Sequence, residues 1–233
     1  AETLQSVLEQ THTNQEILIS DDASTDSTWE IIKSFEKPLR SIFPKVELHH
    51  QPANLGLRGR NNIEFISNRI SSNSNYVQIL EADDCIFPNK TKKCLDFLKE
   101  NPEYAMVHSD FTASWGGEGK QEHFWKTSGR QIPSGYIWDH LINGNFIMTC
   151  TSLLMASIYK EHFDYPKFTK REYILGDYPG CLSIAKAHKI GYLDEDLAHY
   201  RFLSNSTVNN PAGRAAIIAD TEKIKQDARD GFI

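Results

Sequence analysis

The chain has 233 residues, and its 25 lysines and arginines against 31 aspartates and glutamates give a formal net charge of −6. That balance argues against a broad nucleic-acid surface, which needs clustered basic residues, so we expect no nucleic-acid partner. Hydrophobic residues make up 39% of the chain, which is ordinary for a globular protein with a substantial core. No apolar run approaches the roughly 20 residues that span a bilayer. The sequence therefore predicts a cytoplasmic protein, with peripheral association at the inner face of the membrane left open.

The first part of the chain alternates predicted strands with predicted helices. Short apolar runs typical of buried strands occur at 16–20, 46–50, 76–80 and 105–108. Helical patterns lie between them, at 29–35, 63–70 and 94–98. Pro38 and Pro44 are expected to bound a connector. This alternation predicts parallel βαβ units. Because the chain begins inside a helical pattern with no start signal, we also expect that its first strand is missing.

The second part of the chain is less regular. Residues 111–150 contain several glycines and predict a loop-rich region. Beyond it we expect an apolar segment at 152–155, a helix around 178–188, a strand near 191–193 and an amphipathic helix over 214–228.

An acidic cluster, Glu81-Ala82-Asp83-Asp84, follows the third predicted strand. Three carboxylates within four residues repel one another unless a cation neutralises them or solvent screens them. Carboxylate oxygens suit Mg²⁺ or Mn²⁺, and ligands of parallel sheets bind at the carboxyl ends of strands. The position of the cluster favours a cation site over the alternative, a solvated acidic loop that caps the next helix.

A second acidic pair, Asp21 and Asp22, follows the first predicted strand. Residues 24–27 are explained by a polar turn that caps the following helix. The two aspartates exceed what capping needs. One of them is a candidate acceptor for a base N–H or a ribose hydroxyl.

Residues 54–61 combine a glycine turn with Arg58 and Arg60 near a predicted helix start. Arginine recognises diphosphates through bidentate donors, and helix N-termini favour anions. A solvated basic turn is an equally good interpretation. The spacing of a P-loop is absent, which argues against an ATPase of that type.

Four motifs, taken together in this order, resemble family 2 glycosyltransferases of the GT-A fold. They are SVLEQTH at 6–12, DDASTDST at 21–28, NLG at 54–56 with GRNN at 59–62, and EADDCIFP at 81–88. The resemblance covers roughly residues 1–110. It implies an α/β GT-A (Rossmann-like) fold, with a mostly parallel sheet flanked by helices and a loop-rich acceptor region. In these terms residues 1–110 are the nucleotide-sugar-binding half, 111–210 the acceptor-binding and catalytic half, and 211–233 a C-terminal helix.

The resemblance also implies a donor site. Asp22, with Asp21, would contact the nucleoside, typically uracil or its ribose. Asn54 belongs to the NLG motif and is assigned to substrate binding, and Arg60 would lie near the base or the diphosphate.

For the cation, Mn²⁺ or Mg²⁺, the resemblance implies Asp83 as the main ligand of a DXD motif. Glu81 would be a second ligand, and Asp84 would contribute to the donor pocket directly or through water. Glu81 departs from the usual aspartate of this motif.

The second half of the chain matches the family more loosely. Gly176-Asp177 resembles its Glu-Asp motif, which implies Asp177 as the general base that deprotonates the acceptor hydroxyl; a helix cap is the alternative interpretation of Asp177. Tyr200-Arg201 resembles its Tyr-Arg pair. Gly176 replaces the usual glutamate, and Leu203 stands where a histidine is often found.

The expected activity is a metal-dependent inverting transfer of a sugar from a nucleoside diphosphate donor, with UDP expected, to a glycan or lipid-linked acceptor hydroxyl. Two alternatives stay open: a non-catalytic sugar-nucleotide-binding domain of transferase descent, and a sugar nucleotidyltransferase. The sequence does not indicate an oligomeric state.

Overall fold

The computed structural model describes residues 1–116, 119–203 and 211–233. Its strands are β1 (Glu16–Asp21), β2 (Lys45–His50), β3 (Tyr76–Val77), β4 (Cys85–Ile86), β5 (Tyr104–Trp115), β6 (Lys120–Gln121), β7 (Leu153–Met155) and β8 (Lys189–Phe202). Its helices are α1 (Glu2–Leu8), α2 (Thr28–Ile42), the 3-10 helix η1 (Leu57–Gly59), α3 (Arg60–Ser67), α4 (Lys90–Glu100), α5 (Phe124–Thr127), α6 (Trp138–Leu141), the 3-10 helix η2 (Thr149–Thr151), α7 (Ala156–His162), α8 (Tyr165–Lys170), α9 (Tyr178–Ala187) and α10 (Pro211–Arg229).

The strands form two sheets in the described residues. β1 and β2 pair in parallel, as the βαβ pattern predicted. The larger sheet has the order β3-β7-β5-β8-β4, with β6 paired to β5. Its long pair, β5 with β8, is parallel, whereas the short pairings of β3, β4, β6 and β7 are antiparallel. The α/β class is therefore confirmed, and the sheet is mixed.

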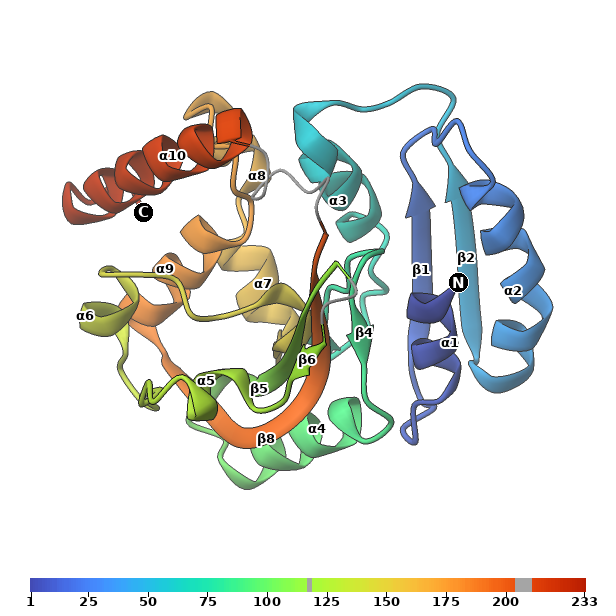
Figure 1. Cartoon of the computed structure of the whole chain (residues 1–233), viewed down its shortest axis with the longest axis horizontal. Coiled ribbons are helices and arrows are strands. Elements are labelled where there is room, and N and C mark those ends of the chain that lie inside the picture. The colour runs from blue at the N-terminus through green and yellow to red at the C-terminus, as the bar shows by residue number, and fades with distance from the viewer. Residues whose placement is uncertain (117–118, 204–210) are drawn as a thin grey trace.

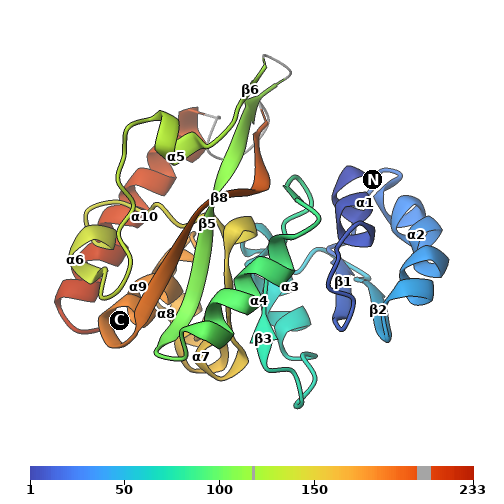
Figure 2. The same cartoon turned by 90° about the horizontal axis from the view of Figure 1, so that it is seen from below.

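Helices cover the sheets and connect them. Figure 1 shows α3 between the β1–β2 pair and the larger sheet, with α8 and α10 at the same end of the molecule. Figure 2 shows α4 crossing the β5–β8 pair. No helix of the described residues is both long and apolar enough to span a membrane.

Several element boundaries differ from the predicted ones. β3 stops after two residues instead of continuing to residue 80, because the chain turns into the acidic cluster. β5 and β8 run far beyond their predicted apolar cores, and their register shifts give them the curvature seen in Figure 1. The predicted connector at Pro38 is wrong, since α2 continues through it. Burial of Ile32 and Leu39 on either side stabilises the helix across this proline.

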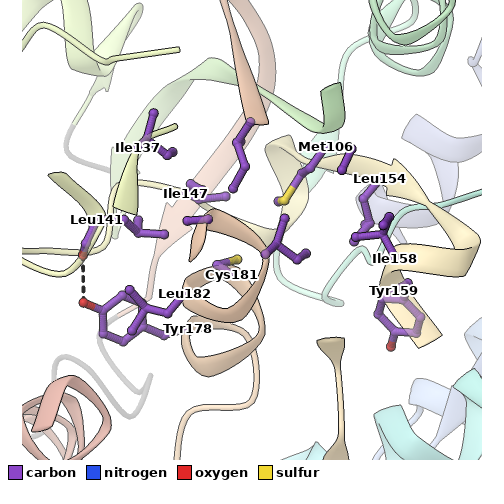
Figure 3. Packing of buried hydrophobic residues seen from close by; sticks show 14 of the residues in the cluster. Met106, Ile137, Leu141, Ile147, Leu154, Ile158, Tyr159, Tyr178, Cys181 and Leu182 are labelled. Atoms are coloured by element: carbon purple, nitrogen blue, oxygen red, sulfur yellow. Dashed lines mark hydrogen bonds between the residues drawn. The ribbon is translucent and has the colours of Figure 1, made fainter. Parts of the chain in front are cut away.

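The main core lies between α9 and the larger sheet. Figure 3 shows Met106 of β5 pointing toward Cys181 of α9 and Leu154 of β7 beside Ile158 of α7, and all four side chains are buried. In β8, Gly191 permits a close approach of α4, because a Cβ there would lie 2.3 Å from the ring of Phe97. The packing of α9 in the main core fixes the start of this helix relative to the larger sheet.

Candidate functional site

The acidic cluster forms a tight loop between β3 and β4, here called the acidic loop (residues 81–84). The N–H of Asp84 donates to the carbonyl of Glu81 at 3.2 Å, which closes the turn. The structure brings together one carboxylate oxygen each from Glu81, Asp83 and Asp84, all within 4.8 Å of one another. In the described part of the chain this is the only group of three or more carboxylate, histidine or cysteine side chains so arranged.

Asp84 is the buried member of the acidic loop, with 1% of its surface exposed. Its Oδ1 accepts the backbone N–H of Arg201 at 3.0 Å. Its Oδ2 is buried with no N–H or O–H donor among the described residues, although the Cys150 thiol lies beside the carboxyl group. Burial raises the pKa of Asp84 to about 6, despite the Arg201 N–H. A buried carboxylate oxygen with no N–H or O–H donor suits a cation ligand.

Glu81 lies at the crowded centre of these charges. Although the residue as a whole is exposed, burial of its carboxyl group and then the charges of Asp177, Asp84 and Asp83 raise its pKa to about 8. The departure from aspartate at this position therefore does not remove the carboxylate from the cluster. Among the neighbouring charges, that of Asp177 makes the largest contribution to the raised pKa of Glu81.

Helix α1 and the end of β8 support the acidic loop from both sides. The hydroxyl of Thr3 donates to the carbonyl of Ala82 at 2.7 Å. The guanidinium of Arg201 donates to the carbonyl of Asp83 and to the carboxylate of Glu2. These contacts hold the backbone of the loop and leave the Asp83 and Glu81 carboxylates free of basic partners in the described residues.

Asp177 is the residue immediately before α9. It occupies the N-cap position of α9, although its side chain makes no capping hydrogen bond. Its carboxyl group is instead hydrogen-bonded to the side chain of Asn145 and to the backbone N–H of Tyr178. Burial, with a smaller contribution from the charge of Asp220, raises its pKa. The side chain borders an apolar cavity of about 20 Å³ that Met106, Ile147 and Cys181 also line, which has room for about one water molecule.

The next residue, Tyr178, anchors the start of α9. Its hydroxyl donates to the carbonyl of Leu141 at 2.8 Å, the dashed line in Figure 3, and the side chain is fully buried. The buried side chain of Tyr178 thus holds the backbone on the C-terminal side of Asp177 in place.

The donor-side carboxylates have protein partners. Asp21 is 4% exposed, and it accepts hydrogen bonds from Ser24 and His50, the latter at 2.8 Å. Asp22 accepts the N–H of Leu55 at 2.7 Å and the amide of Asn54 at 3.0 Å. Asp22 and Asn54 therefore meet, as expected of one site, and together they join the end of β1 to the glycine turn.

Arg60 makes its contacts with residues 169–176, which lead into Asp177. It is 3% exposed, and its guanidinium donates to the carbonyl of Tyr173 and, at 3.3 Å, to the hydroxyl of Thr169. Its aliphatic part packs on Gly176, where an added Cβ would lie 3.4 Å from Cγ. In this structure Arg60 binds the segment before Asp177, so its assignment to the base or diphosphate stays a prediction.

Two supporting residues escaped the sequence analysis. Arg201 was noted only as part of a motif pair, and its link to Asp83 spans 118 positions, which no local pattern reveals. Lys90 begins α4 yet is fully buried, and its ammonium donates to Gln78 at 2.6 Å and to the carbonyl of Ser152 at 2.5 Å. Burial lowers its pKa. The only sequence signal for Lys90 is its position at the start of a helix that packs on the sheet.

Comparison with known proteins gives the same assignment for most of the chain. The family described as "Glycosyl transferase family 2" matches residues 1–163. The putative teichuronic acid biosynthesis glycosyltransferase TuaG of Bacillus subtilis is 27% identical over 218 residues, covering 90% of this chain and 76% of that protein. An uncharacterized glycosyltransferase of Rickettsia bellii is 26% identical over 215 residues, but the chain spans only 28% of its length.

Solved structures agree on the fold. The crystal structure of S. aureus TarS 1–349 in complex with UDP superposes with a TM-score of 0.61 at 15% identity, over 94% of this chain and 60% of that one. A second TarS crystal structure gives a TM-score of 0.59 over 86% of this chain and 34% of that one. The fold is that of the GT-A glycosyltransferases. With the family match over residues 1–163, this shows that the chain belongs to glycosyl transferase family 2.

Proposed function

We propose that this glycosyltransferase moves a sugar from a UDP donor to a hydroxyl of a glycan or lipid-linked acceptor, with inversion at the anomeric carbon and with a divalent cation. The observation that carries the proposal is the acidic loop, with carboxylate oxygens of Glu81, Asp83 and Asp84 within 4.8 Å of one another and with the charge of Asp177 acting on Glu81. UDP as the nucleotide is supported by the TarS complex, and a polysaccharide acceptor by the name of TuaG. We place the reaction in the cytoplasm, at the inner face of the membrane where the acceptor is lipid-linked.

Mn²⁺ or Mg²⁺ fits the donor set of the acidic loop. Asp83 and Glu81 would hold the ion, with Asp84 as a further ligand directly or through water. The fit rests on the buried Oδ2 of Asp84, which has no N–H or O–H donor, and on the absence of an ion pair to any of the three carboxylates among the described residues. When bound, the cation neutralises the negative charge that develops on the departing diphosphate.

Asp177 is the proposed general base. Its raised pKa makes it a better proton acceptor than an exposed aspartate, since a base works best when its pKa approaches the working pH. Asp177 takes the proton of the acceptor hydroxyl as the oxygen attacks the anomeric carbon and the bond to the diphosphate breaks. A single displacement on one face of the sugar inverts the configuration.

On the donor side, Asp22 and Asn54 remain the proposed nucleoside contacts. Their side chains lie on the surface at the carboxyl end of β1, where a bound base or ribose can compete for their hydrogen bonds. Asp21 is buried and fully paired, so we assign it to holding this turn.

The test measures UDP release from a panel of UDP-sugars with Mn²⁺ or Mg²⁺, with and without a panel of glycan and lipid-linked acceptors. Asp83→Asn and Asp177→Asn are each expected to lower turnover at least about 100-fold, the typical effect of removing an electrostatic or proton-transfer group. Asp96→Asn, which changes an exposed carboxylate on α4, is the matched control and should keep wild-type turnover. Full activity in both site variants contradicts the assigned mechanism.

The two alternatives are not favoured, because the family match and the relatives are glycosyltransferases. Calorimetry for binding, together with assays of the products, separates the two alternatives from the proposal. UDP and Mn²⁺ binding with no release or transfer across the whole panel would indicate a non-catalytic binding domain, and formation of a UDP-sugar from UTP would indicate a nucleotidyltransferase.

A further inference from the structure

The C-terminal helix α10 holds the segment that leads into Asp177. This segment, residues 171–176, connects α8 to α9 without regular structure of its own. The carboxylate of Asp220, on α10, is 5% exposed, and its Oδ2 accepts the backbone N–H groups of Ile174 and Leu175, both at 2.8 Å. One side chain therefore fixes two successive peptide groups, two and three residues before Asp177.

A second contact from α10 fixes the beginning of the same segment. Asp227 receives hydrogen bonds from Arg171, with Nε at 2.8 Å, and from the hydroxyl of Tyr173 at 2.6 Å. Lys223 donates to the carbonyl of Arg171. Since Asp220, Lys223 and Asp227 lie on one helix, the whole segment follows the placement of α10, which Figure 1 shows next to α8.

Helix α3 also contacts this segment. Arg60 of α3 donates to the carbonyl of Tyr173, and its aliphatic part packs on Gly176. After Asp177 the chain enters α9, where the N–H of Cys181 donates to the carbonyl of Asp177 at 2.9 Å. The backbone of Asp177 is thus fixed by α9 on its C-terminal side, and on its N-terminal side by Arg60 and α10.

We propose that Asp220 is a positioning residue for the transfer reaction, acting through the backbone before Asp177 to set the direction of that carboxylate toward the acceptor hydroxyl. The proposal rests on the proposed role of Asp177 as the general base. A displacement of about 1 Å at a reacting group can cost about 100-fold in rate, so the loss of two backbone hydrogen bonds next to the base is expected to be felt in turnover.

The first experiment compares Asp220→Ala with Asp220→Asn in the full chain, using UDP release from the donor and acceptor that the wild type turns over fastest. Asp220→Ala should lower kcat about 100-fold while the KM for the donor and the affinity for UDP stay unchanged. Asp220→Asn should restore most of the activity, because its amide oxygen still accepts both N–H groups. Glu222→Ala, an exposed change on the same helix, is the control and should leave kcat unchanged. Equal losses in kcat and in UDP affinity for Asp220→Ala would indicate a general structural role and overturn the proposal.

The second experiment asks whether Asp220 acts through Asp177. In the Asp177→Asn background, the change Asp220→Ala should cause little further loss of kcat, because the group that it positions is already gone. Losses that multiply would place the effect of Asp220 elsewhere and overturn the proposal. If Asp177→Asn itself keeps wild-type turnover, the assignment of the base fails instead.

Amide hydrogen exchange gives a readout that needs no turnover. Asp220→Ala should speed exchange at residues 174–178, whereas Asp220→Asn and Glu222→Ala should leave it near the wild-type rate. Unchanged exchange at 174–178 in Asp220→Ala would show that the segment does not depend on α10, whatever the activity of the enzyme.

Discussion

Two groups of carboxylates follow β1 and β3, and they differ in what they contact. Asp21 and Asp22 are engaged by hydrogen-bond donors of the protein, among them His50 and Asn54. In the acidic loop, by contrast, Asp84 keeps a buried oxygen without an N–H or O–H donor in the described residues. The side chains of Thr3 and Arg201 support the loop by donating hydrogen bonds to its backbone carbonyls.

The comparison separates carboxylates that stabilise the fold from carboxylates that the fold leaves available. The first kind lowers the free energy of the native state through satisfied hydrogen bonds. The second kind costs stability, since like charges lie close together and Asp84 is buried among them, and protons or a cation relieve this cost. Four expected outcomes test the distinction.

The largest effect is expected for Asp84→Asn, which should lower turnover about 100-fold, the cost of altering a metal site's ligands or their supports. The same change should leave the apo protein as stable as the wild type or more so, because the amide oxygen still accepts the Arg201 N–H and one repelling charge is gone. Turnover and thermal unfolding without metal measure the two effects. A clear loss of apo stability would place Asp84 with the stabilising carboxylates.

Asp21→Ala should behave in the opposite way. The change removes the shared acceptor of His50 and Ser24, two exposed residues whose donors can then bind water, so it should cost about 1–2 kcal/mol in the free energy of unfolding. Urea unfolding measures it. A variant as stable as the wild type, with impaired UDP binding, would instead return Asp21 to the donor site.

The pH dependence of stability should show the acidic loop directly. The pKa of Glu81 is raised from 4.5 to about 8, so the folded state retains a proton that the unfolded state loses. The contribution of Glu81 to the stability of the folded state is therefore fully present below about pH 4.5, and it is lost as pH rises to about 8. As pH rises through this window, ionisation of Glu81 should therefore lower the melting temperature of the metal-free protein. Mn²⁺ should restore the melting temperature most at the alkaline end. The same profile in Glu81→Gln as in the wild type would contradict the assignment.

Glu16 provides the smallest effect, with the opposite sign. Although burial opposes it, hydrogen bonds from Ser71 and Ser74, with Lys45, lower its pKa to about 2. Its contribution is present above about pH 4.5 and is lost as pH falls toward 2. Glu16→Gln should cost about 1 kcal/mol near neutral pH and flatten the acid limb of the stability curve. An unchanged acid limb would show that this carboxylate makes no net contribution.

Much of this site could be predicted from the sequence because its residues directly follow the apolar runs that predict strands. The apolar run before residue 81 and the spacing of Glu81, Asp83 and Asp84 indicated the acidic loop, and the structure brings their oxygens together. Asp22 and Asn54, 32 positions apart, were assigned to one site and do touch.

What the sequence could not indicate is decided by long-range partners. Arg60 has the chemistry of a diphosphate ligand, yet burial against Tyr173 directs it to the segment before Asp177, 113 positions away. Likewise Asp220 lies in an amphipathic helix with nothing to mark it, and its role follows only from two backbone N–H groups of a distant segment. The antiparallel pairings of the short strands also depend on how the chain returns to the sheet.

The link from Arg201 to Glu2 bears on the order in which the protein folds. It joins residues 199 positions apart, and the contact of Thr3 with Ala82 spans another 79. Because such distant contacts are closed late in folding, the acidic loop is expected to gain its shape only after the first helix and the end of the long β8 strand have both docked. During synthesis, the chain must therefore emerge beyond the end of β8 before the acidic loop can take this shape.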